Sequence, residues 1–331
     1  MPVKGKCSEP FNRIHQLPQR LRWKALTSKT MLRYFANRIL GSTNRKVRSF
    51  LFNMLAETPG ADFAYVSRGR ERYLVNCHDK AISKMVFATG EFEFEKFERA
   101  LQVLRFQTPM TELDLLVDVG ANIGTVCIPA VVRGLVRAAV GIEPHPVNCK
   151  LLRANIALNS VDARVAVHES AVGECDNETL MLELSTDNWG DHRSAVTRED
   201  GKFGEAARKT IAVQSMRLDG LVAPSMAKNA LIWMDAQGYE GFILKGAAAL
   251  LDVRVPLVSE FWPYGMRRAG SYSLFREQLS GYRGFIDLND EAAVHQSLSG
   301  KGDTLHPMSD LNALHDALDV GPSSYTEILV V

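Results

Sequence analysis

Long hydrophobic runs are missing from this sequence of 331 residues. No stretch approaches the roughly 18 consecutive apolar residues that a membrane-spanning helix needs, and Arg133 and Arg137 interrupt the most apolar region. The opening residues, MPVKGKCSEP, carry positive charge but no apolar segment follows them, so no secretory signal is predicted. We therefore expect a protein without a membrane span that is located in the cytoplasm.

Cysteine is also scarce, and none of it is paired in the sequence. The number of cysteines is odd and no CxxC pair occurs, which argues against a disulfide framework and against a zinc site. The histidines show no HExxH spacing, and no Ser-His-Asp nucleophile elbow is present. A reducing compartment and no bound metal are expected. The five cysteines are Cys7, Cys77, Cys127, Cys149 and Cys175.

Acidic residues are nearly absent from the first fifty positions. Twelve Lys or Arg stand there against one acid, Glu9, although the whole chain has a net charge of only +1. Helical spacing in this segment predicts a basic helical extension over residues 1–60. Such an arm could bind nucleic acid or an anionic surface. We favour packing on the acidic remainder of the chain, because aromatic residues are not interleaved with the basic ones as a stacking platform requires.

The rest of the sequence predicts an α/β fold. Residues 61–110 predict a hairpin, with strands at 63–66 and 73–75, followed by helices at 80–88 and 92–105. From residue 111 to 331, short β-branched runs alternate with helical stretches, a pattern typical of a parallel sheet covered on both faces. The expected strands are 115–119, 138–142, 164–167, 179–184, 211–215, 231–234, 257–258, 285–288 and 327–331.

A glycine-containing turn follows the first of the alternating strands, in LLVDVGANIGTVCIPA. The strand ends at Asp118, and Gly120 and Gly124 allow a tight turn in which the backbone approaches a ligand closely. The next helix would present its free N–H groups to that ligand. A dinucleotide site would need G-x-G-x-x-G, but Asn122 occupies the second glycine position. The motif therefore disfavours NAD without excluding it.

A carboxylate stands at the end of the next predicted strand. Glu143 lies in AAVGIEPHPVN, nineteen residues after Gly124. A carboxylate at this point can accept hydrogen bonds from the two hydroxyls of a ribose, which NAD and S-adenosyl cofactors share. The spacing of Asp118, the glycine turn and Glu143 together favours a nucleoside cofactor over a chance surface acid.

These motifs, taken together, resemble the FkbM-type methyltransferase family over roughly residues 60–331. The resemblance implies a seven-stranded Rossmann-like methyltransferase sheet with helices on both faces at 111–331. It also implies S-adenosylmethionine as the methyl donor, and commonly O-methylation of a hydroxyl on a sugar, glycan or polyketide-type small molecule. The motifs are TGEFEFE (89–95), DVGANIG (118–124), IEPHPVNCKLLRANIALN (142–159), WMDAQGYEGFILKGA (233–247) and EFWP (260–263).

The resemblance also implies a set of residues that bind the donor. Asp118 and the glycine turn would flank the methionine part, and Glu143 would hold the ribose. Small residues after the third strand would leave room for the adenine. The implied cofactor-binding residues are Glu93, Asp118, Gly120, Asn122, Gly124, Glu143, Ser170 and Ala171.

Three residues are candidates for catalysis. Asp235 and Glu260 end the fourth and fifth strands, and side chains at these ends face the crevice in open α/β sheets. His192 is expected on a loop over the site, and histidine titrates in the range useful for a base. Family members often carry Glu where Gln237 stands, so a carboxylate role there is in doubt. Asp235 and Glu260 could also bind magnesium, but their spacing is not a recognised metal signature, and Glu240 is a weaker catalytic candidate.

Two other function classes stay open at this point. One is a nicotinamide-dependent oxidoreductase, and the other is a noncatalytic methyltransferase-like module that binds nucleic acid through its basic arm. The acceptor is not determined by the motifs, because loops build acceptor pockets. Tyr264, Arg267 and Arg268 suggest a polar or anionic acceptor, and no pattern predicts the oligomeric state.

Overall fold

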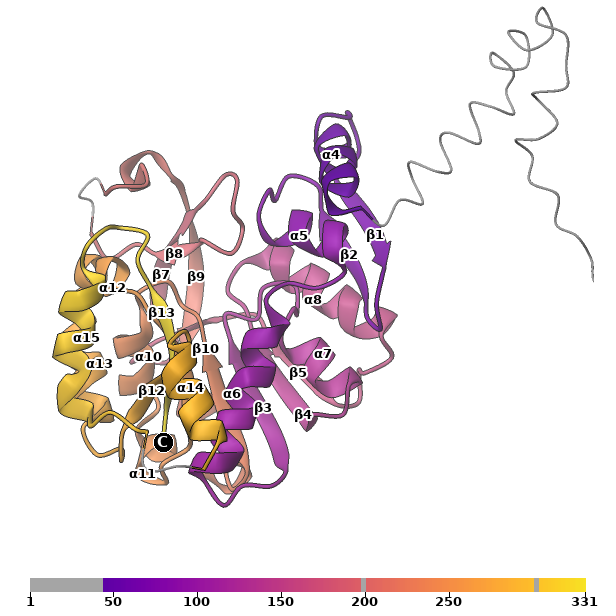
Figure 1. Cartoon of the computed structure of the whole chain (residues 1–331). Helices are drawn as coiled ribbons and strands as arrows, with labels where there is room; N and C mark the ends of the chain where they lie inside the picture. Colours follow the sequence, from indigo (N-terminus) through magenta and orange to yellow (C-terminus); the bar gives the residue numbers. More distant parts are fainter. Residues whose placement is uncertain (1–43, 198–200, 301–303) are drawn as a thin grey trace, which may run out of the picture.

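The structure is a computed structural model that describes residues 44–197, 201–300 and 304–331 (Figure 1). The helix predicted within the basic extension is present over α4 (Arg45–Ala56), and the prediction for residues 1–43 lies outside the described residues. None of the described helices combines the length and the apolar character that crossing a bilayer would require.

A seven-stranded sheet forms the centre of the fold, in the order β12-β13-β11-β10-β3-β4-β5. All neighbouring strands run parallel except around β13, which is antiparallel to both of its neighbours. The predicted α/β class and sheet are therefore confirmed. The strands are β3 (Leu113–Val119), β4 (Val136–Ile142), β5 (Val165–His168), β10 (Ala230–Met234), β11 (Leu257–Phe261), β12 (Phe285–Asp287) and β13 (Thr326–Val330).

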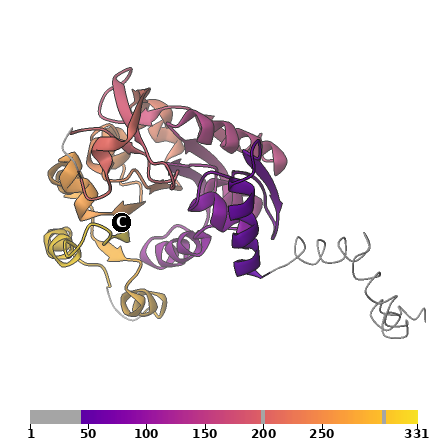
Figure 2. The ribbon, with the colours of Figure 1, turned by 90° about the horizontal axis from the view of Figure 1, so that it is seen from above.

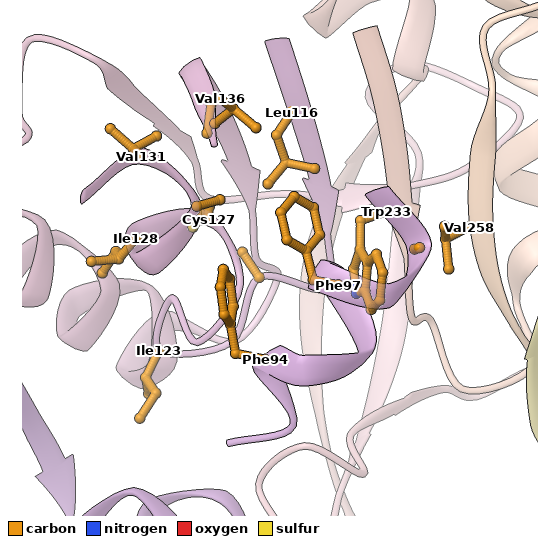
Figure 3. Packing of buried hydrophobic residues seen from close by; sticks show 14 of the residues in the cluster. Phe94, Phe97, Leu116, Ile123, Cys127, Ile128, Val131, Val136, Trp233 and Val258 are labelled. Atoms are coloured by element: carbon orange, nitrogen blue, oxygen red, sulfur yellow. The ribbon is translucent and has the colours of Figure 1, made fainter. Parts of the chain in front are cut away.

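Successive side chains along each strand point to opposite faces of the sheet, so the core is divided into two clusters. Leu115 and Val117 belong to one buried cluster, whereas Leu116 between them belongs to the other. This period of two is what an extended strand imposes. Phe97 packs edge-on against Trp233 of β10, with ring centroids 5.6 Å apart (Figure 3).

Helices cover both faces of the sheet (Figures 1 and 2). The face that carries Leu116 and Trp233 packs against α6 (Phe94–Gln107), α7 (Cys127–Val132), α8 (Pro146–Leu158) and α14 (Glu291–Leu298). The opposite face packs against α9 (Leu218–Leu221), α10 (Glu240–Lys245), α11 (Ala248–Asp252), α12 (Pro263–Ala269), α13 (Tyr272–Leu279) and α15 (Leu311–Leu318). Three short 3-10 helices are η1 (Glu205–Ala207), η2 (Pro224–Met226) and η3 (Met308–Asp310).

A second, four-stranded sheet was not predicted, although its two longest strands were. It has the order β6-β9-β7-β8 and lies in sequence between β5 and β10. The loop at 185–192 joins β7 to β8. The strands are β6 (Ala171–Val172), β7 (Thr179–Leu184), β8 (Arg193–Ser194) and β9 (Lys209–Met216).

The predicted hairpin consists of β1 (Phe63–Ser67) and β2 (Arg72–Asn76), followed by α5 (Ile82–Thr89). Asn155 of α8 takes the place of a further strand at the edge of β2, because its side chain accepts from Leu74 N (2.6 Å) and donates to Leu74 O (3.2 Å). One helical turn later, Asn159 makes the same pair of bonds with Arg72 at an exposed site.

We expect Asn155→Ala to lower the free energy of unfolding by about 2–4 kcal/mol, because the part-buried backbone groups of Leu74 and the buried Ile123 O would lose their partners. Asn159→Ala is the matched control, and water can replace its bonds, so a loss of only about 0.5–1 kcal/mol is expected. Denaturant unfolding measures both values. Equal losses in the two variants would contradict the strand-like role of Asn155.

Candidate active site

A cavity of about 130 Å³ lies at the carboxyl ends of the parallel strands. In an open α/β sheet this is the edge where ligands bind. Ten of the eleven residues predicted to bind the cofactor or to act in catalysis line the cavity: Glu93, Asp118, Gly120, Asn122, Glu143, Ser170, Ala171, His192, Asp235 and Glu260. We call the part around Gly120, Asn122 and Glu143 the glycine-loop end, and the part around Asp235, Glu260 and Glu327 the acidic end.

The remaining residue, Gly124, does not line the cavity. Its backbone has φ +90°, and an added Cβ would meet Ile128 Cδ1 at 2.4 Å and Leu152 Cδ1 at 2.8 Å. Gly124 therefore allows close packing of α7 and α8 behind the glycine turn.

Gly120 brings the ends of two neighbouring strands together. Its φ is +85°, and a Cβ at this position would lie 2.1 Å from the backbone oxygen of Asp235. Its N–H and that of Ala121 both donate to Ile142 O, at 3.0 Å each. No residue with a side chain fits there without moving β3 away from the end of β10.

Glu143 is buried at the end of β4, and both of its carboxylate oxygens are already oriented. Oε2 accepts from Asn122 N (2.9 Å) and Oε1 from His145 N (2.8 Å). Burial raises the pKa of Glu143 to about 7, against the opposing effect of these two N–H groups. Each oxygen keeps a further lone pair, so the carboxylate can accept hydrogen bonds from two hydroxyls of a ligand.

Asp118 is the last residue but one of β3, and it holds the start of the following helix. Its Oδ2 accepts from Cys127 N at 3.1 Å. Burial raises its pKa to about 7. The carboxyl group therefore stabilises the glycine turn through its bond to the start of α7, and it also forms part of the cavity wall.

Asn122 connects the glycine turn to the loop at 185–192. Its backbone is left-handed, with φ +49°, a conformation that asparagine tolerates better than most residues. Its Nδ2 donates to Trp189 O at 3.1 Å, and its Oδ1 accepts from Ile123 N at 2.8 Å. A second glycine at this position would lose both bonds.

The acidic end contains the two predicted carboxylates of β10 and β11. Gln237, with φ +55°, donates through Nε2 to Asp235 Oδ1 (2.7 Å) and to Glu260 Oε2 (3.1 Å). Asp235 is exposed where it lines the cavity, and desolvation by the surrounding protein still raises its pKa to about 6. Burial and the nearby Asp235 raise the pKa of Glu260 well above its usual range. An amide at position 237 thus serves as a donor to two acids, which a glutamate could not do.

Sequence reasoning did not identify Glu327 and Lys96, which complete the acidic end. Glu327 is the direct cross-strand partner of Glu260, and like charges in such a pair repel. Lys96 Nζ contacts Glu327 Oε1 at 2.5 Å and Glu93 Oε2 at 2.7 Å. Burial lowers the pKa of Lys96, but the contact with Glu327 outweighs it and the net pKa is raised. The spacing of Lys96 three residues after Glu93 on a helix was the one available signal.

His192 lines the cavity at the end of the predicted loop. Its Nδ1 accepts from Ser185 N at 3.1 Å, so the proton of the neutral ring is on Nε2. Burial, followed by the nearby His145, lowers its pKa to about 3. In this arrangement His192 presents an N–H donor at the cavity wall.

Glu240 has a local structural role. It is buried at the start of α10, and its Oε1 accepts from Ala236 N (3.0 Å) and Gly238 N (3.2 Å). Within the described residues, no group of three or more Asp, Glu, His or Cys side chains is arranged to hold a metal ion.

Residues 118–279 match the family model for the methyltransferase FkbM domain. The chain carries a methyltransferase FkbM domain. The family resemblance of the sequence motifs is thereby confirmed. No curated protein matches the chain closely enough to count as a relative.

Several solved structures are similar in part. A methyltransferase FkbM from Methylobacillus flagellatus KT is 17% identical, with a TM-score of 0.39, and the match covers 86% of this chain and 59% of that one. The tRNA methyltransferase TrmK of B. subtilis is 8% identical, with a TM-score of 0.35, and the match covers 70% of this chain and 64% of that one. The chain thus spans less than two thirds of either protein. A geranyl diphosphate methyltransferase, solved with GPP and sinefungin, is 11% identical, with a TM-score of 0.35 and coverage of 76% and 80%.

The methyltransferase FkbM domain supplies most of the cavity wall, from Asp118 to Glu260. Glu93, Lys96 and Glu327 lie outside the matched residues and close the acidic end. The site therefore combines the domain with the helix that precedes it and with the last strand of the chain.

Proposed function

We propose that the protein is an S-adenosylmethionine-dependent methyltransferase that methylates a hydroxyl on a sugar, glycan or polyketide-type small molecule. The observation that carries the proposal is that one cavity has two chemically different ends. A glycine turn and an oriented carboxylate, Glu143, form one end, and a pair of carboxylates with raised pKa values forms the other.

The glycine-loop end suits the donor on two grounds. Gly120 lines the cavity with its backbone alone, and the buried hydroxyl of Ser170, which also lines the cavity, has no hydrogen-bond partner among the described residues. In the proposed arrangement Glu143 binds the ribose hydroxyls, and Asp118 and Gly120 border the methionine part. Glu93 lines the same cavity from the acidic end, where it pairs with Lys96, and Ala171 leaves room beside Ser170. The donor supplies a methyl group on a positively charged sulfur.

The acidic end would accept the proton of the acceptor hydroxyl. Asp235 is the proposed base, because its pKa of about 6 leaves it ionised at neutral pH, and its side chain opens into the cavity. Glu260, whose pKa is raised well above its usual range by burial and by the nearby Asp235, would orient the acceptor. Gln237 holds the two carboxyl groups in place. Much of the rate enhancement would come from this positioning.

The charges of the acidic end favour a neutral acceptor. Lys96 is the one cation among the described residues that line the cavity, and it already contacts two acids. The side chains that had suggested an anionic acceptor have other partners: Tyr264 bonds to Glu205, Arg267 pairs with Asp319, and Arg268 pairs with Glu183. A phosphate or carboxylate next to the reacting hydroxyl would therefore be repelled.

Glu143→Gln tests the donor site. Affinity for S-adenosylmethionine, measured by calorimetry on the full chain, should fall by about 10- to 100-fold, because the neutral amide leaves one acceptor oxygen in place of two. Glu178→Gln, at an exposed residue outside the cavity, is the matched control and should not change it. Unchanged affinity in Glu143→Gln would refute the proposed site.

A further inference from the structure

Buried polar atoms without partners gather near the glycine-loop end. Six side chains in the described part of the chain have such an atom. Ser170 Oγ and His192 Nε2 belong to residues that line the cavity, His145 Nδ1 belongs to the residue that donates to Glu143, and Asn148 Oδ1 lies one turn further on. Because burial of an unpaired polar atom is unfavourable, the two atoms that belong to cavity-lining residues, Ser170 Oγ and His192 Nε2, are suited to bind a ligand.

The segment 185–192, which we call the flap loop, is fixed to the glycine-loop end. Trp189 O accepts from Asn122 Nδ2 (3.1 Å) and from Asn148 Nδ2 (3.2 Å). Trp189 N donates to Asp79 Oδ1 at 3.3 Å, which ties the loop to the segment before α5 as well. The loop thus lies over the residues that orient Glu143.

Three rings meet where the flap loop reaches the cavity. The centroids of His145 and His192 are 4.4 Å apart, and that of Trp189 is 5.3 Å from His145 and 6.0 Å from His192. Trp189 and His192 both line the cavity. Among the described residues His192 Nε2 has no hydrogen-bond partner, so its proton is available to an acceptor atom of a ligand.

We propose that the flap loop is part of the donor site, with His192 Nε2–H donating a hydrogen bond to an acceptor atom of the adenosyl group and Trp189 covering that group. The inference rests on the proposed function and assigns His192 to binding in place of base catalysis. Adenosine fits because its ribose and base carry several acceptor atoms, and because the flap loop shares Asn122 with Glu143.

The test uses the full chain and S-adenosylhomocysteine, which contains the adenosyl group but no methyl to transfer. His192→Ala should weaken its binding by about tenfold, the effect of one hydrogen bond with partial burial. His192→Gln, which keeps an N–H donor, should recover part of the affinity. His295→Ala, at an exposed histidine of α14, is the matched control and should bind as the unmodified chain does.

Hydrogen exchange gives a second measurement that does not depend on a substitution. Binding of S-adenosylhomocysteine should protect the amides of residues 185–192 in the unmodified chain. Equal affinity in His192→Ala, together with unprotected flap-loop amides, would overturn the inference and leave the proposed function standing. If the unmodified chain fails to bind S-adenosylhomocysteine, the proposed function fails and the inference fails with it.

Discussion

Gly120→Ala should lower the free energy of unfolding by about 3–5 kcal/mol and abolish measurable binding of S-adenosylhomocysteine. The methyl group would lie 2.1 Å from a backbone oxygen of Asp235, and the residue has φ +85°. Left-handed strain and overpacking against a backbone atom both contribute, and neither can be relieved by a side-chain rotation. Denaturant unfolding and calorimetry measure the two effects.

Gly134→Ala separates backbone strain from the steric clash. Gly134 has φ +72°, but an added Cβ would meet nothing within 4 Å. A loss of about 1–2 kcal/mol is expected, with unchanged ligand binding. If Gly120→Ala were no more harmful than Gly134→Ala, the close approach of β3 to the end of β10 would not be what fixes glycine at position 120.

Asp235→Asn should reduce kcat by about 10²- to 10⁴-fold while affinity for S-adenosylhomocysteine stays within about twofold. The substitution keeps the size of the side chain and removes the proposed base. In the unmodified enzyme, kcat should fall as the pH drops below about 6, because protonated Asp235 cannot accept the proton of the hydroxyl. In Asp235→Asn this decrease should disappear from the residual activity.

Asp252→Asn is the matched control for the base. Asp252 is exposed at the end of α11 and does not line the cavity, so its variant should keep both activity and pH profile. Full activity in Asp235→Asn would contradict the assignment of Asp235 as the base. Glu260, which accepts from the same Gln237 side chain, would then be the next candidate.

Residues at the ends of parallel strands could be predicted from the sequence. Asp118, Glu143, Asp235 and Glu260 each follow a short apolar run, and parallel strands bring such ends to one edge. The glycine turn was visible for the same reason, since Gly120 directly follows a buried strand. Local pattern and chain direction together were sufficient for this part of the site.

Features that depend on strand order or loop contacts could not be predicted. Glu327 reaches the acidic end because β13 runs antiparallel next to β11, and nothing in its own segment encodes that neighbour. The proposed role of His192 Nε2–H as a hydrogen-bond donor depends on the bond from Ser185 N to His192 Nδ1, and only the conformation of the loop shows this bond. Asn122 was predicted to bind the cofactor, but its contact with Trp189, which joins two segments 67 residues apart, could not be predicted.

One calorimetric comparison tests the central claim most directly. The full chain is titrated with S-adenosylhomocysteine and, separately, with NADH under the same conditions. We expect saturable 1:1 binding of S-adenosylhomocysteine that Glu143→Gln weakens, and no heat of binding from NADH. Saturable binding of NADH with no response to S-adenosylhomocysteine would contradict the account.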